Sequence, residues 1–256
     1  MPGYTGIRLL SVVYQVIHFP SRTQNPIIPS MATIISTANQ KGGPGKTTTA
    51  INVTAALIAA GYRVTVVDTD RQASFWKWNR IRTRKGLSPF NVLTVPEGIL
   101  AEELQRLRAE PDIDIVMVDC PGNIAEITQI AVEASDAVLC PVRATWADFE
   151  ATKDMAKLVE GLQQQHPDMK YMLFLSCSHA ARNIDKRARE NMQRVFAKTR
   201  NVSVFNTAIP DTAVLAEFGG AGQTIFEYAR NSPSARLYKK LTKEVQACLL
   251  AQTASA

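Results

Sequence analysis

Short apolar segments alternate with longer amphipathic segments from residue 33 onwards. The short segments are rich in β-branched residues and apolar at successive positions, which is typical of strands buried on both faces of a sheet. The longer segments repeat apolar residues every three or four positions, which indicates helices. The predicted strands are residues 33–37, 63–68, 91–95, 113–119, 137–141, 171–177 and 202–205. The predicted helices are residues 47–60, 74–84, 98–109, 125–133, 149–165, 184–198 and 234–250.

This alternation predicts an α/β fold with a mostly parallel sheet and helices on both faces. The 256 residues contain no evident repeat or linker, so we expect residues 32–250 to form one domain. Residues 1–31 are predicted to be a weakly ordered N-terminal extension, and an added edge strand is the alternative. Its apolar run over residues 9–17 follows Arg8, but no small-residue cleavage site comes after it. Residues 251–256 are predicted to be a polar tail.

A glycine-rich segment, residues 39–48, lies between the first predicted strand and the first predicted helix. Its glycines let backbone N–H groups turn inward, and the positive end of the following helix adds to an anion site. Lys46 can reach the β- and γ-phosphates of a nucleotide, and the Thr47 hydroxyl can hold Mg²⁺. The predicted nucleotide-binding residues of this phosphate loop are Lys41, Gly42, Gly43, Pro44, Gly45, Lys46, Thr47 and Thr48.

Two acidic segments directly follow other predicted strands, at residues 68–70 and 119–123. Because the carboxyl ends of parallel strands meet at one edge of a sheet, we expect both segments to face the phosphate loop. Asp119 is expected to contact Mg²⁺, in part through water. The N–H of Gly122 can then reach the γ-phosphate, which makes Asp119 and Gly122 a candidate switch released by hydrolysis. A helix-capping role for Asp119 and a solvated turn at residues 68–70 are the structural alternatives.

The phosphate loop differs by one position from the usual pattern, because Gln40 stands where that pattern has glycine and Lys41 follows it. This lysine-rich form resembles the deviant Walker A motif of the ParA/MinD family of ATPases. Residues 141–148, 208–211 and 222–228 also resemble segments of that family. The similarity extends over nearly all of residues 32–250 and is greatest to the small plasmid-type ParA proteins that partition DNA.

The resemblance implies roles for several further residues. Asp70, in the second acidic motif, would position the attacking water, and Asp68 would support the metal shell. Arg71 stands where the family usually has proline, which puts the hydrolysis rate in doubt. Pro210 and Asp211 would flank the adenine.

Lys41 has a distinct role in the family, where the matching lysine reaches across a dimer to the partner's nucleotide. The resemblance therefore implies a homodimer in the ATP state, with Lys41, Lys46 and Asp70 as the catalytic residues and ATP and Mg²⁺ as cofactors. It also implies slow hydrolysis, stimulated by a small centromere-binding partner of the ParB or ParG kind, and a cytoplasmic, nucleoid-associated location.

Basic residues gather in two stretches, at residues 182–198 and 230–243. The formal net charge of +6 permits binding to a polyanion without demanding it. By the resemblance, the ATP dimer would bind DNA without sequence preference. The candidate DNA-binding residues are Arg182, Arg187, Arg189, Arg236, Lys239 and Lys240. Solvated helix faces are the alternative, because Glu190 and Glu244 dilute the charge.

Other functions within the same superfamily remain open. The MinD branch binds membranes through a C-terminal amphipathic helix, and residues 237–249 carry an apolar i, i+4 stripe. Residues 251–256 offer no bulky apolar anchor, so we predict no membrane binding. A cargo-positioning ATPase unconcerned with DNA segregation is a further alternative. A metal-cluster reductase of the nitrogenase iron protein type fits poorly, because the spacing of Cys120 and Cys140 does not match that family.

Overall fold

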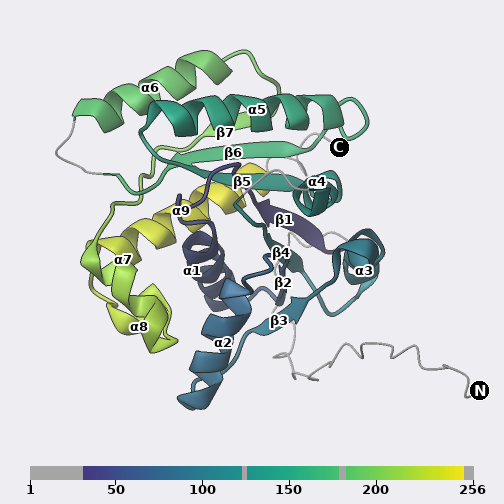
Figure 1. Cartoon of the computed structure of the whole chain (residues 1–256), viewed down its shortest axis with the longest axis vertical. Coiled ribbons are helices and arrows are strands. Elements are labelled where there is room, and N and C mark those ends of the chain that lie inside the picture. Colours follow the sequence, from purple (N-terminus) through teal and green to yellow (C-terminus); the bar gives the residue numbers. More distant parts are fainter. Residues whose placement is uncertain (1–30, 123–125, 179–182, 251–256) are drawn as a thin grey trace, which may run out of the picture.

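The seven strands of the described chain form one parallel sheet in the order β3-β2-β4-β1-β5-β6-β7 (Figure 1). The structure is a computed structural model, and it describes residues 31–122, 126–178 and 183–250. The strands are β1 (Thr33–Thr37), β2 (Val64–Asp68), β3 (Asn91–Thr94), β4 (Ile115–Asp119), β5 (Ala137–Val142), β6 (Lys170–Leu175) and β7 (Val202–Val204). The predicted parallel α/β fold is therefore confirmed.

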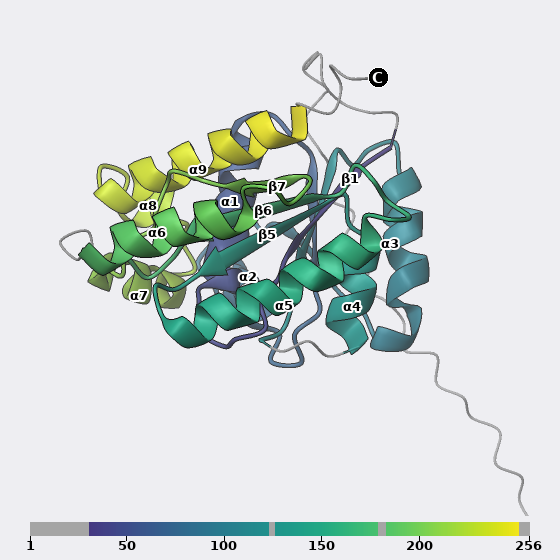
Figure 2. The ribbon, with the colours of Figure 1, turned by 90° about the horizontal axis from the view of Figure 1, so that it is seen from above.

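Helices cover both faces of this sheet. The helices are α1 (Lys46–Ala59), α2 (Ser74–Arg84), α3 (Leu100–Ala109), α4 (Glu126–Glu133), α5 (Trp146–Leu162), α6 (Asn183–Phe196), α7 (Ala213–Glu217), α8 (Ile225–Tyr228) and α9 (Pro233–Leu250). One core lies between the sheet and α3 to α6, and a second core lies between the sheet and α1, α2, α8 and α9. Figure 2 shows α5 and α6 in front of the strands, with α1 and α2 behind them.

The two cores explain why the strands read as continuous apolar runs. Neighbouring residues of one strand enter opposite cores, as Ile34 and Ile35 do in β1 and as Val66 and Val67 do in β2. A strand that is buried on both faces needs apolar side chains at every position. This local requirement made the strands visible in the sequence.

Several boundaries differ from the predictions. Helix α5 begins three residues before the predicted position 149, because the Thr145 hydroxyl accepts a hydrogen bond from the Asp148 N–H (3.2 Å) and caps the helix. Strand β6 ends at Leu175, and Cys177 then adopts the left-handed conformation (φ 48°), which ends the extended chain. The short helices α7 and α8 were not predicted, since four or five residues are too few to show helical periodicity.

The expectations for residues 1–30 and 251–256 lie outside the described residues and remain predictions. At residue 32, where the domain was predicted to begin, the side chain of Ala32 is buried in the first core. No described helix is long and apolar enough to cross a membrane.

The carboxyl ends of the three central strands lie level with one another. Asp119 at the end of β4 is the register partner of Thr37 in β1 and of Asp68 in β2. The phosphate loop follows β1 directly and leads into α1. The strand pairing therefore brings the phosphate loop and the two acidic segments to one edge of the sheet, as the sequence predicted.

An ion pair between a buried arginine and a partly exposed glutamate ties α2 to α8. The Arg82 guanidinium is 5% exposed and donates to both carboxylate oxygens of Glu227 at 2.7 Å. It also packs over the rings of Trp78 and Phe90, at 5.7 and 5.2 Å from their centroids. Glu227 in turn caps α8 through Thr224. This contact fixes the segment that precedes α9 against the helix that follows the second acidic motif.

We predict that Arg82→Ala lowers the free energy of unfolding by roughly 2 kcal/mol, because it removes a buried guanidinium that hydrogen-bonds to the partly exposed Glu227 carboxylate. The matched control is Arg106→Ala, which breaks an ion pair of α3 whose arginine side chain is 41% exposed. That control should cost less than about 1 kcal/mol. Urea unfolding measures both. Equal losses in the two variants would contradict the role given to Arg82.

Candidate nucleotide site

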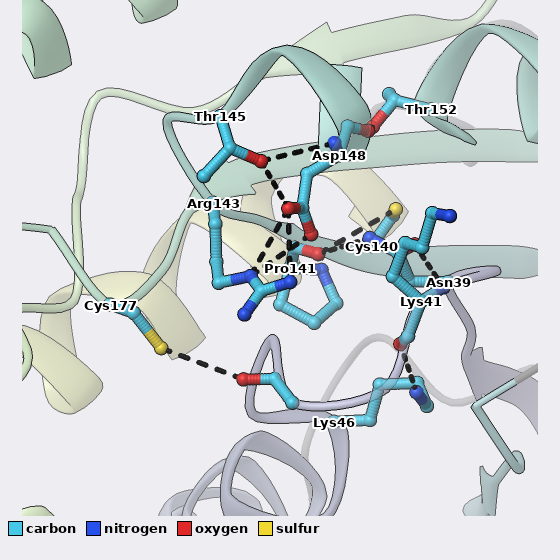
Figure 3. A network of polar contacts seen from close by, with 11 residues as sticks. Asn39, Lys41, Lys46, Cys140, Pro141, Arg143, Thr145, Asp148, Thr152 and Cys177 are labelled. Carbon is cyan, nitrogen blue, oxygen red and sulfur yellow. Dashed lines mark hydrogen bonds and ion pairs between the residues drawn. The ribbon is translucent and has the colours of Figure 1, made fainter. Parts of the chain in front are cut away.

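The phosphate loop owes its shape to glycine and to a support from β5 (Figure 3). Gly43 and Gly45 have φ angles of 84° and 88°, a region that residues with a side chain rarely adopt. Asn39 stabilises the start of the loop, since its amide donates to the Pro141 carbonyl at 2.7 Å and its side-chain oxygen accepts from the Lys41 N–H at 3.0 Å. The loop is therefore held in an anion-binding form by the protein itself.

Lys46 begins α1 and points back into the loop. Its side chain is buried, and Nζ donates to the Lys41 carbonyl at 3.0 Å. Burial lowers the pKa of Lys46, and the nearby Asp119 opposes that effect. An ammonium group has three donors, so this one can bind phosphate oxygens while it keeps its contact with the loop.

Asp119 and Thr47 form the candidate magnesium site. The Asp119 carboxylate has no exposed surface, and it accepts hydrogen bonds from the hydroxyls of Thr47 (2.7 Å) and Thr37 (3.2 Å). Burial, with the nearby charge of Asp68, raises the pKa of Asp119 to about 7. A hydroxyl and a carboxylate are hard oxygen donors of the kind that Mg²⁺ prefers.

The donor set fits a magnesium ion that shares its ligands with a nucleotide. Among the described residues, no group of three or more acidic, histidine or cysteine side chains could hold a metal ion. Mg²⁺ is commonly held by one or two protein oxygens, with phosphates and waters completing its shell. Thr47 and Asp119 would supply the protein oxygens, and the ion would neutralise charge on the phosphates.

The acidic segment at residues 68–70 forms a tight turn before α2. Asp68 is buried, and its carboxylate accepts from the N–H groups of Asp70 (3.2 Å) and Trp76 (2.9 Å). Burial raises the pKa of Asp68. Asp70 is half-exposed and accepts from the Gln72 N–H at 2.8 Å. Asp68 thus shapes the turn that presents Asp70, while its predicted part in the metal shell remains a prediction.

Gly122 lies against the phosphate loop. A Cβ atom at this position would lie 3.0 Å from the Gly42 Cα and 3.5 Å from Lys46 Nζ, so only glycine fits without displacing the loop. The switch role of Gly122 remains a prediction. Residues 123–125, which continue this segment, lie outside the described residues.

The segments predicted to flank the adenine join the same edge. Pro210 pairs with Ser178 in a short parallel bridge, and the Asp211 N–H donates to the Ser178 carbonyl at 2.9 Å. The neighbouring Cys177 lies beside the phosphate loop, with its Sγ 3.8 Å from the Gly43 carbonyl oxygen. The ends of β6 and β7 therefore border the site.

One pair of site residues was not predicted from the sequence. Arg143 follows β5, and its guanidinium binds the buried carboxylate of Asp148 in α5. A Cβ atom at Gly43 would lie 3.6 Å from Arg143 Nη1, so the guanidinium borders the phosphate loop. The only sequence signal was the resemblance of residues 141–148 to a loop of the family.

The described candidates for DNA binding lie on two helices, α6 and α9, that pack on opposite faces of the sheet. Arg187 is exposed, whereas Arg189 is half-buried and donates to the Asn206 carbonyl at 3.0 Å. The three candidates on α9 are exposed, and so is Lys243 on the same helix. Arg182 lies outside the described residues.

The arrangement as a whole defines the class of protein. A parallel sheet carries a lysine-containing phosphate loop after its central strand, and a buried aspartate on the adjacent strand bonds the loop threonine. These are the parts of a P-loop nucleotide hydrolase.

Comparison with known proteins narrows this class. The family model of the ATPase MipZ matches residues 33–200. The chromosome-partitioning ATPase Soj of Thermus thermophilus is 30% identical over 242 residues, which cover 83% of this chain and 95% of the relative. The sporulation initiation inhibitor protein Soj of Bacillus subtilis is 28% identical over 256 residues, with 85% and 99% covered.

The fold comparison agrees with the sequence comparison. The septum site-determining protein MinD of Pyrococcus horikoshii, solved as a complex with Mg-ADP, has a TM-score of 0.62 and 20% identity. That match covers 84% of this chain and 96% of the MinD chain. The chain belongs to the ParA/MinD family of ATPases.

The buried carboxylate predicts a pH-dependent stability. In the absence of divalent ions, Asp119 is protonated in the folded chain below pH 7 but ionises near pH 4 when unfolded. Its contribution to the free energy of unfolding therefore falls as the pH rises from about 4 to about 7. We expect Asp119→Asn to stabilise the chain by roughly 2 kcal/mol at pH 8 and by less at pH 5.

Urea unfolding in a chelator at the two pH values measures this gain. The control is Asp154→Asn, which changes an aspartate with 54% of its side chain exposed and should give no comparable gain. A gain for Asp119→Asn that does not grow between pH 5 and pH 8 would contradict the raised pKa.

Proposed function

We propose that this ATPase partitions DNA: it dimerises when ATP is bound, binds DNA without sequence preference as the dimer, and leaves DNA after hydrolysis. The observation that carries the proposal is the position of Lys41. This residue is exposed beside the phosphate loop, and its backbone is tied to Asn39 and Lys46. Within the described residues its ammonium group has no hydrogen bond or ion pair.

An exposed lysine beside a phosphate loop suits delivery to a second chain. In a twofold dimer each Lys41 would meet the nucleotide of the partner. The added cation would neutralise charge that develops on the phosphates, and it would make dimer formation depend on ATP. Its fixed backbone and free ammonium group support this role, because the side chain can leave its own loop without breaking the loop's hydrogen bonds.

The remaining residues divide the chemistry among them. Lys46 and the loop amides would hold the phosphates, and Thr47 and Asp119 would hold Mg²⁺. Asp70 would position the attacking water, and the Gly122 amide would report whether the γ-phosphate is present. Phosphoryl transfer depends chiefly on such positioning and charge neutralisation. The level ends of β1, β2 and β4 support the assignment, because they bring the segments that carry these residues to one edge.

Helix α9 supplies the candidate DNA surface. Its apolar stripe is used within the fold, since Leu241 and Val245 are fully buried in the core beneath it. The opposite side presents four exposed cations, Arg236, Lys239, Lys240 and Lys243. A helix with its apolar side in a core and its basic side in solvent suits a polyanion better than a membrane. Two copies in a dimer would double the number of phosphates that the protein binds.

The partner would be a small centromere-binding protein that stimulates a slow basal ATPase, and the dimer would reside on the nucleoid. The name of the Thermus thermophilus relative, a chromosome-partitioning ATPase, supports a chromosomal setting. A cargo other than DNA is the second outcome of the same tests. An ATP dimer that forms normally but does not bind DNA would favour that outcome.

Lys41→Ala should remain a monomer with ATP under conditions in which the wild-type chain dimerises. Its ATPase rate should fall by about 10²-fold or more, as expected for a lost transition-state donor. Analytical ultracentrifugation and phosphate release measure the two effects. Lys85→Ala, at an exposed lysine after α2, is the matched control. Normal dimers together with normal turnover in Lys41→Ala would refute the role across the dimer.

Replacing Lys239 and Lys240 together by alanine should weaken DNA binding equally for unrelated sequences. The slope of log affinity against log salt should fall by about one unit for each phosphate that the variant no longer neutralises. Fluorescence anisotropy with ATP and with ADP measures both. Lys157→Ala, at an exposed lysine of α5, should leave the slope unchanged. Equal binding in the two nucleotide states would contradict the switch.

A further inference from the structure

Arg143 places a positive charge at the phosphate loop from a different strand. It follows β5, and Figure 3 shows its guanidinium between Asp148 and the phosphate loop. A Cβ atom at Gly43 would be 3.6 Å from Arg143 Nη1, so Nη1 borders the space that a side chain at this loop position would fill. The loop therefore has a third cationic neighbour in addition to Lys41 and Lys46.

The position of this guanidinium is fixed by a buried carboxylate. Arg143 Nε lies 3.1 Å from both oxygens of Asp148, and Nη2 lies 3.1 Å from one of them. Asp148 is 1% exposed and sits in the first turn of α5, where its N–H donates to the Thr145 hydroxyl and that hydroxyl also contacts its carboxylate. A two-point contact of this kind sets the plane of the guanidinium as well as its place.

The same contact leaves one end of the guanidinium available. Arginine has five N–H donors, and Asp148 is bound through Nε and Nη2. Across the described ranges Nη1 has no acceptor, and the Arg143 side chain is 37% exposed. The free end is the one that borders Gly43. The side chain is thus anchored on the protein side and open on the side of the loop.

We propose that Arg143 is a nucleotide-binding residue whose Nη1 donates to the phosphate chain of the nucleotide held in the phosphate loop of the same protomer. A planar, permanently charged donor at a fixed position matches phosphate oxygens better than a flexible lysine does. Asp148 acts as a positioning residue, because it orients the guanidinium without contacting the nucleotide. The proposal rests on nucleotide binding by the loop and is independent of dimerisation and DNA binding.

A purely structural role must be separated from this one, because Arg143 also neutralises the buried Asp148. The double variant Arg143→Gln/Asp148→Asn removes both charges together, so no buried carboxylate is left unpaired. The matched control is Arg108→Gln/Asp136→Asn. That pair has the same chemistry, with Nη1 of Arg108 at 3.0 and 2.9 Å from the two oxygens of Asp136, and lies at the amino end of β5.

The test is the dissociation constant of a fluorescent ADP for each monomer with Mg²⁺, together with competition by unlabelled adenosine. The double variant at residues 143 and 148 should bind ADP about tenfold more weakly than wild type and adenosine equally well, since one charge-assisted hydrogen bond to phosphate is removed. The control double variant should bind both as wild type does. Arg143→Lys should be intermediate, because it keeps the charge but cannot bind Asp148 at two points.

Three results would overturn the proposal. Wild-type ADP affinity in the double variant would mean that Arg143 serves only to neutralise Asp148. An equal loss of affinity for ADP and adenosine would mean that the substitutions distort the site. A defect confined to ATP-dependent dimerisation would place Arg143 on the surface between protomers. None of these results bears on DNA binding, so failure here is distinguishable from failure of the proposed partition function.

Discussion

The fully buried carboxylate of Asp119 is the constraint on which the site depends. Taking a carboxylate out of water costs free energy unless hydrogen bonds or a cation compensate. Here two threonine hydroxyls, from β1 and from the phosphate loop, donate to it, and its pKa is nevertheless raised to about 7. A magnesium ion bound with a nucleotide would relieve this unfavourable charge. The chain therefore holds a destabilising group at the candidate magnesium site.

The other segments at the carboxyl edge of the sheet hold the Asp119 carboxylate in place. The register of β4 with β1 and β2 puts Asp119 level with Thr37 and Asp68. Gly122 packs against the phosphate loop, and Asn39 ties the start of that loop to the end of β5. Strands on both sides of β1 thus restrain the phosphate loop. A phosphate bound in this loop would therefore also contact or displace the segments at the ends of β4 and β5. This coupling gives the proposed switch at Gly122 a physical basis.

The sequence predicted what is decided locally. Strands buried on both faces need apolar residues at each position, and a phosphate loop needs its glycines, lysine and threonine in order, so both could be found by pattern. The helix that contains Ile225 was missed, because it is too short to repeat. The pairing of Arg82 with Glu227 was also missed, since these residues are 145 positions apart and meet only through tertiary packing.

The role of Arg143 in the site was likewise missed, because it depends on tertiary packing. Its partner Asp148 is only five positions away, but nothing in the spacing says that the carboxylate is buried or that Nη1 faces Gly43. Both facts depend on how β5 and the phosphate loop end at the same edge. Side-chain roles that arise from two segments meeting in space could be predicted here only where the family resemblance supplied them.

The central claim is that each site is completed by a second chain, and a mixing experiment tests it most directly. On the proposed roles, Lys41→Ala lacks the lysine for its partner's site, and Asp70→Ala lacks the carboxylate that positions water in its own site. If Lys41 acts across the dimer, a mixed dimer has one site with Asp70 and a partner's Lys41. Combining the two inactive variants should then restore ATP hydrolysis. A mixture as inactive as either variant alone would contradict the account.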